Sequence, residues 1–362
     1  MAACQALSYD RARKFDYGSP GRSTIRGLRI IVREPTTTAP FFIVGSGRSG
    51  STLLRMMLAA HSRLSIPPET WYLLPLVKRF SFDRPLNPDE IEAAVATITG
   101  HYRWSEMKLS TQEFRGAVSQ LTRPYLRDLV EVVYRWHLQA EGKVRWGDKT
   151  PPYIEILPEL ARMYPDSRFI HLIRDGRDVA KSFQTTDWVG RWLHDNATEW
   201  LRALECHWRW MRSGIRERIL EVRYERLVLE TEATLREVCE FIGEQFEPRM
   251  LAWDWQVDRL VPSREMHNHP KLKQRIGPEG VSRWKREMGA RELFVAEAFM
   301  GSHLARLGYE RRYNSPLWQP AFALTRWYCR TVLPGVEFSV RAARFLRKRL
   351  SLRQRPTGRS LN

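Results

Sequence analysis

The chain has 362 residues, of which 43% are hydrophobic and 28% charged, and its formal net charge is +18. This composition is typical of a globular protein and excludes wholesale disorder. No stretch approaches the roughly 18 uninterrupted apolar residues of a membrane-spanning helix, and the N-terminus shows no secretory signal. The four cysteines are scattered without zinc spacing, which favours free thiols in a reducing compartment.

The positive charge is concentrated at the two ends of the chain. Residues 311–362 hold twelve Lys/Arg and one acid, and residues 1–40 hold seven and three, which leaves only +3 for residues 41–310. A nucleic-acid-binding protein more often carries its basic residues in the folded recognition domain, so we do not expect nucleic acid as a partner. The sequence predicts a basic N-terminal arm over 1–40, one folded domain over 41–310, and a basic, aromatic extension over 311–362.

The central part alternates short apolar runs with helical patterns. Strands are expected at 41–44, 144–146, 169–173 and 219–222, and helices at 51–60, 154–163, 175–183 and 231–242. Strands that alternate with helices predict an α/β fold, in which a parallel sheet is flanked by helices in a P-loop-like, three-layer domain. Residues 71–142 are expected to be a helical insertion, and residues 147–151 a turn after the second strand.

The first predicted strand runs into a glycine-rich turn and then a helix. Glycines allow the backbone to approach an anion, and a helix N-terminus offers unpaired N–H groups. Gly45, Gly47 and Gly50 have the spacing of a dinucleotide-binding loop, and Glu69 lies near the place of a ribose-binding acid. Gly45 and Gly50 also have the spacing of a nucleotide-triphosphate loop, but Ser51 stands where its lysine would be. The loop predicts an anion site without identifying the anion.

The segment 169–182 predicts a second phosphate site. Arg174 follows a predicted strand and Ser182 lies two turns into the next helix, so both side chains can reach one phosphate. Because this site is separate from the glycine-rich loop, the ligand should carry phosphates at two ends. A 3′-phosphoadenosine nucleotide has this arrangement, which neither a nicotinamide dinucleotide nor ATP requires.

Together, the segments 45–52, 147–151 and 174–182 resemble the sulfotransferases that use 3′-phosphoadenosine 5′-phosphosulfate (PAPS). The pattern is most similar to the tyrosylprotein-sulfotransferase-like branch and its bacterial relatives. In that branch the catalytic glutamate lies 21 residues after the loop arginine, as Glu69 follows Arg48. The serine that binds the 3′-phosphate lies eight residues after its arginine, as Ser182 does here after Arg174.

The resemblance covers about residues 41–310 and implies a role for each matching residue. Glu69 would be the general base on the acceptor, and Lys149 would contact the sulfuryl group or the bridging oxygen as charge develops. Arg48 would be the third catalytic residue and would hold the 5′-phosphosulfate. Asp148 is expected to orient Lys149 or to cap a helix. PAPS is expected as the co-substrate, without a metal, because no His/Cys/Asp cluster has metal spacing. The residues expected to bind the nucleotide are Arg48, Ser49, Gly50, Ser51, Thr52, Arg174, Ser182, Tyr224 and Arg283.

Two departures separate the chain from the tyrosine-directed enzymes. Thr186 stands where they have another arginine, and Arg283 replaces their lysine. The acceptor hydroxyl therefore stays open among carbohydrate, peptide tyrosine, lipid and small molecule, and residues 71–142 are expected to cover it. A nucleotide-dependent kinase and a non-catalytic nucleotide-binding protein are the alternative functions, and the oligomeric state is open.

Aromatic residues mark two further segments. The tryptophans of 188–210 are expected either to pack helices together or to form the floor of an acceptor site. The extension interleaves aromatic residues with arginines, so we expect it either to contact an anionic membrane or to be a solvated or packed tail. Without a membrane anchor the chain differs from the Golgi-resident sulfotransferases, which favours a cytoplasmic location, peripheral at the membrane if the extension binds lipid.

Overall fold

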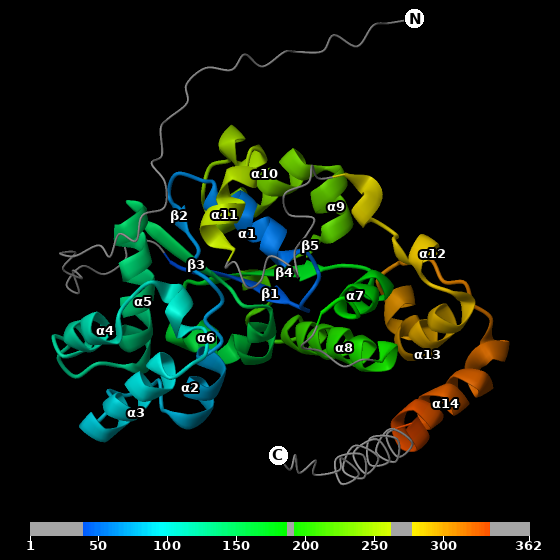
Figure 1. The fold of residues 1–362 in the computed structure, drawn as a ribbon, viewed down its shortest axis with the longest axis horizontal. Helices are drawn as coiled ribbons and strands as arrows, with labels where there is room; N and C mark the ends of the chain where they lie inside the picture. The colour runs from blue at the N-terminus through cyan, green and yellow to red at the C-terminus, as the bar shows by residue number, and fades with distance from the viewer. Residues whose placement is uncertain (1–38, 187–191, 262–276, 334–362) are drawn as a thin grey trace, which may run out of the picture.

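The computed structural model describes residues 39–186, 192–261 and 277–333. A sheet of five strands in the order β2-β3-β1-β4-β5 forms its centre (Figure 1). Every neighbouring pair is parallel, so the predicted α/β class and parallel sheet are confirmed. The strands are β1 (Phe41–Gly45), β2 (Leu64–Ser65), β3 (Arg145–Lys149), β4 (Arg168–Ile173) and β5 (Ile219–Arg223).

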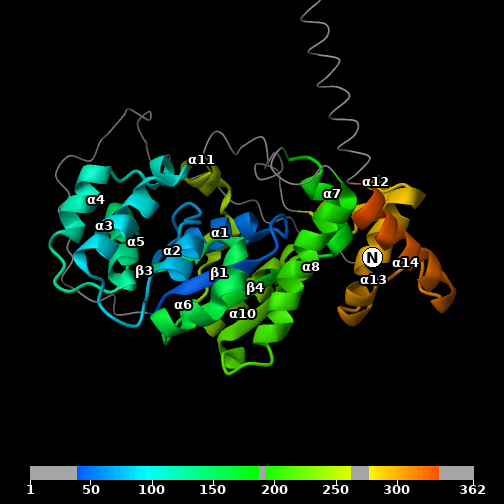
Figure 2. The ribbon, with the colours of Figure 1, turned by 90° about the horizontal axis from the view of Figure 1, so that it is seen from below.

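Helices cover both faces of the sheet, which makes three layers (Figures 1 and 2). Parallel strands require this arrangement because each crossover between them passes over a face of the sheet. One face is covered by α1 (Ser51–Ala59), α9 (Tyr224–Leu229), α10 (Thr231–Ile242) and α11 (Val257–Leu260). The other face is covered by α5 (Leu126–Glu141), α6 (Leu157–Met163) and α8 (Leu193–Trp210).

The central strand β1 is buried along its whole length. Phe41 and Ile43 belong to the apolar core that contains α1 and α10, whereas Phe42 and Val44 belong to the core that contains α5 and α6. Successive side chains of a strand point to opposite faces, so a strand covered on both faces needs a continuous apolar run. This is why the short run after Pro40 predicted the strand correctly.

Strand β3 extends further than the sequence predicted. Instead of a turn over 147–151, the strand continues to Lys149, and the 3₁₀ helix η2 (Pro151–Ile156) begins after Thr150. Gly147 lies opposite Phe41 of β1, whose ring occupies the space of a side chain at this position. The turn prediction was wrong because the polar residues of this strand find partners far away in the sequence. Strand β2 was not predicted, since two residues show no periodicity.

The helical insertion predicted over 71–142 is present. Capping boxes start α3 at Asn87 and α4 at Ser110, where each side chain accepts a hydrogen bond from an N–H of the first turn. The ring of Tyr134 in α5 stacks on Trp146 of β3 with 3.9 Å between centroids, which fixes the insertion to the sheet. The elements are α2 (Leu73–Arg79), α3 (Pro88–Thr99), η1 (Trp104–Met107), α4 (Thr111–Val118) and α5.

The C-terminal helices form a third apolar core at the opposite end of the molecule from the insertion (Figure 2). No helix in the described ranges is long and apolar enough to cross a bilayer. The predicted arm, apart from residues 39 and 40, and the part of the extension after residue 333 lie outside the described residues. The elements of this core are α7 (Gly176–Phe183), α8, α13 (Ala290–Arg306) and α14 (Gln319–Trp327), and the short α12 (Trp284–Glu287) lies beside α7.

Three tryptophans of the segment 188–210 pack helices together. The indole N–H of Trp200 donates to the main-chain carbonyl of Arg174 at 3.0 Å, and Trp200 is fully buried. Trp208 stacks on a histidine of α13, and Trp210 donates to a carbonyl of η2. Of the two roles expected for these tryptophans, these three side chains therefore have the packing role. Of the remaining two, Trp192 is partly exposed and Trp188 lies outside the described residues.

Candidate active site

Residues 45–52 connect β1 to α1 through a tight turn. The φ angles of Gly45 and Gly50 are +139° and +94°, which residues with a side chain rarely adopt. A Cβ at Gly50 would also lie 2.4 Å from the ring of Tyr224. The turn leads into the N-terminus of α1, which no side chain caps. The N–H groups of residues 49–52 are therefore arranged as in an anion site.

The hydroxyl groups of the turn support this interpretation. Ser49 is only 1% exposed, and its Oγ has no hydrogen-bond partner among the described residues. Leaving a buried hydroxyl unpaired costs about 1–3 kcal/mol, which a ligand oxygen at this position would recover. Ser51 is buried as well, and Thr52 Oγ1 lies 3.4 Å from Lys149 Nζ.

Arg174 directly follows β4, and Ser182 lies in α7, the helix after it. The Arg174 guanidinium donates to the carbonyl of Gly280 at 2.6 Å and stacks 4.2 Å from the centre of the Tyr224 ring. It also pairs with Asp178 at 3.6 Å, but both side chains are buried, so this is no surface ion pair. The Nε of Arg174 is buried and has no partner within the described ranges. Arg174 thus keeps a donor for a ligand.

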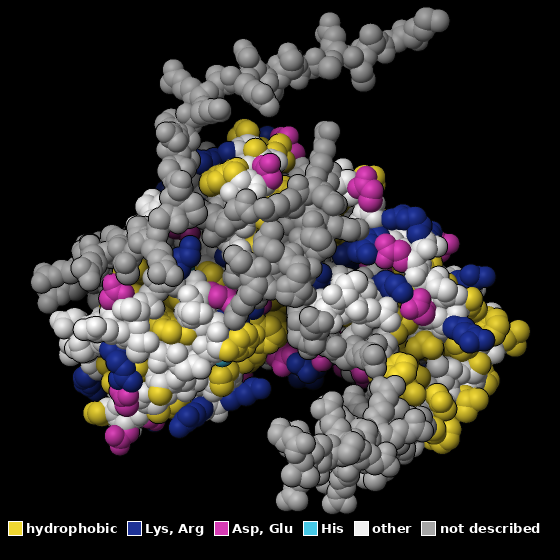
Figure 3. Space-filling model, in the orientation of Figure 1, with side chains coloured by type: hydrophobic (Ala, Val, Ile, Leu, Met, Phe, Trp, Pro, Cys, Tyr) yellow, Lys and Arg dark blue, Asp and Glu magenta, His cyan; other side chains and the backbone are white. Residues whose placement is uncertain are grey.

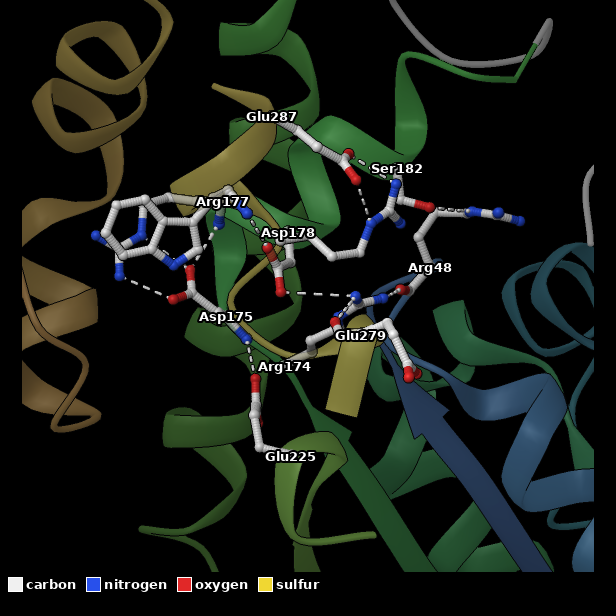
Figure 4. A network of polar contacts seen from close by, with 12 residues as sticks. Arg48, Arg174, Asp175, Arg177, Asp178, Ser182, Glu225, Glu279 and Glu287 are labelled. Carbon is white, nitrogen blue, oxygen red and sulfur yellow. Dashed lines mark hydrogen bonds and ion pairs between the residues drawn. The ribbon is translucent and has the colours of Figure 1, made fainter. Parts of the chain in front are cut away.

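Arg48 turns toward the same place (Figure 4). Its backbone has a φ of +65°, a left-handed conformation that non-glycine residues keep mainly where the surroundings enforce it. Its Nε donates to Ser182 Oγ at 3.1 Å, and its carbonyl accepts from Arg174 at 3.3 Å. The sequence predicted Arg48 at the 5′-phosphosulfate. In the structure its guanidinium contacts the serine expected at the 3′-phosphate, and its role at the 5′ end stays a prediction.

Tyr224 and Arg283 complete this group. Tyr224 begins α9 directly after β5 and packs against the glycine loop. Arg283 pairs with Glu287 at 2.8 Å. Burial and the charges of Arg174 and Arg283 lower the pKa of Arg48 to about 10. Three guanidinium groups gathered in this way repel one another, and an anionic ligand between them would relieve the repulsion.

A buried ionic network next to Arg174 was not predicted. Arg177 is 1% exposed, and its guanidinium binds Asp175 and Glu297, each at 2.8 Å. It also lies 3.6 Å from the centre of the Trp284 ring (Figure 4). The network ties the start of α7 to the segment that carries Arg283. The sequence motif contains Arg177, but Glu297 is 120 residues away, so only the fold pairs them.

Glu69 lies in an irregular segment between β2 and α2, not in the first turn of a helix. Its carboxylate forms a short ion pair with Lys149. It also accepts a hydrogen bond from the indole N–H of Trp71 at 2.7 Å, and Arg103 of the helical insertion lies 3.6 Å away. Trp71 has a φ of +42°, so the backbone beside Glu69 is also left-handed.

The charges around Glu69 decide its protonation. Burial raises the pKa of Glu69. The charges of Lys149 and Arg103 and the hydrogen bonds from Lys149 and Trp71 lower it by more than burial raises it, so the pKa is about 2. Burial also lowers the pKa of Lys149, which Glu69 opposes. Glu69 is therefore ionised at neutral pH. A carboxylate with so low a pKa is a weak base until its ion pair opens.

Buried hydrogen bonds fix the residues beside this ion pair. Asp148 accepts from the hydroxyls of Thr70 and Tyr134, each at 2.8 Å. The expectation that Asp148 orients Lys149 or caps a helix was wrong, because its carboxylate instead fixes Thr70 next to Glu69. All of these polar side chains come from different elements, and sequence reasoning offered no signal that would join them.

Arg55 of α1 is a second supporting residue that was not predicted. It is 3% exposed and donates to the carbonyl of Ile66 through both Nε, at 3.1 Å, and Nη2, at 2.9 Å. Its Nη1 donates to the carbonyl of Leu260 at 3.1 Å. A buried guanidinium thereby ties the helix after the glycine loop to the segment that carries Glu69.

The two groups of residues form one site at the carboxyl edge of the sheet. Lys149 lies opposite Ile43 in the register of β3 and β1, which places it beside the start of the glycine loop. Arg174 directly follows β4, which pairs with the other side of β1. Ligands of open α/β sheets bind at this edge, where the chain leaves neighbouring strands in opposite directions.

The sequence profile of the sulfotransferase family matches residues 40–248. The chain belongs to the sulfotransferase family. The matched range contains the glycine loop, Glu69, Lys149, Arg174 and Ser182, whereas Arg283 lies beyond it. The family predicted from the sequence is confirmed, and the predicted enzyme class and the donor PAPS are those of this family.

Named relatives share about a quarter of their residues with this sulfotransferase. The nodulation protein NoeE of Sinorhizobium fredii is 26% identical over 292 residues, which are 75% of this chain and 66% of NoeE. Protein-tyrosine sulfotransferase 2 of Gallus gallus is 24% identical over 286 residues, which are 76% of this chain and 70% of that protein. The sulfotransferase thus spans about two thirds of the length of these relatives.

Two solved sulfotransferase domains have the same fold. The domain from the curacin biosynthetic pathway is 21% identical, with a TM-score of 0.54, over 76% of this chain and 98% of the domain. The domain from the Synechococcus PCC 7002 olefin synthase is 24% identical, with a TM-score of 0.55, over 75% and 96%. The predicted P-loop-like architecture is therefore confirmed.

The described residues fit the two-ended nucleotide that this family uses. The glycine turn leaves no room for side chains at Gly45 and Gly50, and the Ser49 hydroxyl is unpartnered within it. The unpaired Nε of Arg174 lies at the other end of the site. Among the residues that the structure describes, no group of three His, Cys, Asp or Glu side chains is arranged to hold a metal ion.

Proposed function

We propose that this sulfotransferase moves the sulfuryl group of PAPS to an acceptor hydroxyl, with Glu69 as the general base. The proposal rests on the ion pair between Glu69 and Lys149 at the edge of the glycine loop, where Lys149 Nζ also lies 3.4 Å from Thr52. A carboxylate can take the acceptor proton at this position, while the neighbouring cation stabilises charge on the transferred group.

In this proposal the nucleotide lies along the edge of the sheet. Residues 49–52 would hold the 5′-phosphosulfate with their N–H groups and hydroxyls, and Arg174 and Ser182 would hold the 3′-phosphate. Tyr224 would contact the adenosine, and Arg283 would add positive charge. The arginine Arg48 lies between these ends, since its side chain already contacts Ser182. The bound donor supplies a sulfuryl group attached to a good leaving group, the nucleotide phosphate.

Glu69 acts on the acceptor in this scheme. The proton of the acceptor hydroxyl moves to a carboxylate oxygen of Glu69. The acceptor oxygen forms its bond to sulfur while the bond between sulfur and the phosphate oxygen breaks and its electrons stay on the phosphate. Lys149 links the two events, because an ammonium that moves from Glu69 toward the transferred group raises the pKa of the carboxylate and makes it a better base.

The helical insertion is the proposed cover of the acceptor. Trp71 and Arg103 come from residues 71–142 and both contact Glu69, which supports this assignment. Thr186, which replaces an arginine of the tyrosine-directed enzymes, donates to the carbonyl of Phe183 at 2.7 Å, so its hydroxyl closes the end of α7. The acceptor is proposed to be a hydroxyl of a carbohydrate, peptide tyrosine, lipid or small molecule. The cytoplasmic location stays a prediction from the sequence.

Calorimetric titration with 3′,5′-adenosine bisphosphate tests the nucleotide site without a known acceptor. We expect the bisphosphate to bind much more tightly than AMP or Mg-ATP, because only the bisphosphate carries both phosphates. Equal binding of AMP, or a preference for Mg-ATP, would favour the kinase alternative. Tight binding of the bisphosphate without turnover of PAPS across a panel of hydroxyl acceptors would favour a non-catalytic nucleotide-binding protein.

A further inference from the structure

Helix α14 and its continuation, the π-helical turn η9 (Tyr328–Val332), are apolar on two opposite faces. Phe322 and Cys329 are buried in the core that α14 shares with α8 and α13. On the other face, Leu324 is 64% exposed and Trp327 is 55% exposed. A helix that is apolar all round is normally buried on every side. The exposed face therefore has the composition of a contact surface.

This outer face is the largest gathering of exposed apolar side chains in one segment of the described chain. Figure 3 shows hydrophobic side chains collected along the edge of the molecule where α14 lies. The face borders an apolar groove of about 700 Å³ between α8, α13 and α14, which Val295 and Leu324 help to line. The members of the outer face are Leu317, Leu324, Trp327 and Tyr328. Trp318 is also partly exposed, but its ring packs against Phe294 and Tyr313.

The segment that carries the outer face has a strong excess of positive charge. Residues 311–333 contain four arginines and no acid, and residues 334–362 add eight Lys/Arg and one acid. Arg330 is exposed on η9, next to the aromatic side chains. Tryptophan and tyrosine prefer the boundary between water and hydrocarbon, and arginine binds lipid phosphates there. The combination fits an anionic lipid surface.

We propose that the outer face binds the surface of an anionic lipid bilayer, with α14 lying in the plane of the interface. A second copy of the chain on the same face would bring its arginines against these arginines, which disfavours a symmetric dimer. The described part of this helix, α14 with η9, is shorter than the roughly 20 residues that cross a bilayer, which supports a position in the plane of the interface. The inference does not depend on the proposed reaction.

Vesicle co-sedimentation of the full chain tests this proposal. The vesicles contain equal parts of phosphatidylcholine and phosphatidylglycerol, and vesicles of phosphatidylcholine alone serve as the uncharged comparison. We expect the double variant Leu324→Ser, Trp327→Ser to lower the partition coefficient at least about tenfold, because both apolar anchors are lost. Arg330→Gln should lower it about fivefold, the effect of one basic residue near the surface.

A matched control is available on another part of the molecule. Leu251 and Trp255 are 41% and 51% exposed, and they lie near α11, on the far side of the sheet from α14. The double variant Leu251→Ser, Trp255→Ser should bind vesicles like the wild type. Circular dichroism melting of all variants checks that they are folded.

Three results would overturn the proposal: unchanged binding of the outer-face double variant, equal losses in the two double variants, or equal binding to the uncharged vesicles. Sedimentation velocity adds a fourth. A dimer that only the outer-face substitutions dissociate, with no vesicle binding by the wild type, would assign the face to a second copy of the chain.

Discussion

The two halves of the active site are built in different ways. The nucleotide half consists of short, continuous segments, residues 48–52 and 174–182, which leave the ends of β1 and β4. The acceptor half is assembled from separate elements, since Glu69 precedes α2, Arg103 belongs to the insertion and Lys149 ends β3. One half depends on local backbone geometry, and the other depends on buried side-chain contacts between distant segments.

This difference determines how each half should respond to an amino-acid substitution. In the nucleotide half the backbone turn positions the N–H groups of residues 49–52, so a side-chain substitution should leave these N–H groups in place. In the acceptor half, Glu69 and Lys149 hold each other and rest on Asp148 and Thr70. A change at any member should alter the protonation or the position of the others.

The largest expected effect separates the two halves completely. Glu69→Gln removes the base but keeps the shape of the side chain, so kcat should fall about 100- to 10,000-fold. The affinity for 3′,5′-adenosine bisphosphate should change by less than about twofold, because Glu69 bonds to Lys149, Trp71 and Arg103, whereas Arg174 bonds to Asp178 and Gly280. Steady-state rates and calorimetry measure the two quantities. Losses of equal size in both would show that the halves are not independent.

The converse variant, at Arg174, should weaken nucleotide binding. Arg174→Ala should weaken binding of the bisphosphate about 10- to 100-fold, because a charge-assisted contact with the 3′-phosphate is lost. Binding of AMP, which lacks that phosphate, should weaken much less, because only the contacts of Arg174 with Tyr224 and the Arg48 carbonyl are lost. Arg168→Ala, at the other end of β4, is the matched control and should bind both ligands like the wild type. A similar loss for AMP would contradict a 3′-phosphate role.

The pH dependence sharpens the description of the acceptor half. Lys149→Met removes the strongest charge that lowers the pKa of Glu69, so this pKa rises from about 2. In the wild type, Glu69 stays ionised between about pH 5 and 8, so its titration should not lower kcat/KM in this range. In the variant, Glu69 should begin to take up a proton toward the low end of this range, so kcat/KM should fall there. Lys285→Met, at an exposed lysine paired with Glu310, is the control.

Lys149→Met should also change how the stability of the fold depends on pH. A carboxylate whose pKa is lowered by folding stabilises the fold above its unfolded value and loses this contribution as the pH falls toward about 2. Because Lys149→Met raises the pKa of Glu69 in the folded protein, the variant should gain less stability from this group at neutral pH. Acid unfolding followed by circular dichroism should therefore begin at a higher pH. Coincident acid transitions for variant and wild type would argue against the ion pair.

The smallest expected effect concerns the support of the base. Thr70→Val keeps the size of the side chain but takes a donor from the buried Asp148, so the free energy of unfolding should fall by about 1–3 kcal/mol. Thr198→Val, whose exposed hydroxyl only contacts its own helix, should change it by less than about 0.5 kcal/mol. Urea denaturation measures both. An unchanged stability of Thr70→Val would show that Asp148 does not depend on Thr70.

Much of the fold and of the nucleotide half could be predicted because both depend on local rules. A buried run such as residues 41–44 is recognisable as a strand, and glycines with positive φ mark a tight turn before a helix. Arg174 directly follows one strand and Ser182 lies in the next helix, and both contact Arg48. The boundaries of the predicted domain and the roles of the site residues stay predictions.

The sequence by itself determined the α/β class, which follows from periodicity. It also determined the family, through the resemblance of its motifs, because each motif is a continuous segment, and from the same motifs it predicted the residues of the nucleotide half. Only the tertiary structure decided that β3 continues to Lys149, that Asp148 supports Thr70 and that Arg177 pairs with Glu297. Each of these features depends on a buried polar group that must find its partner inside the protein. Such partners are chosen by the packing of distant segments, which no local pattern contains.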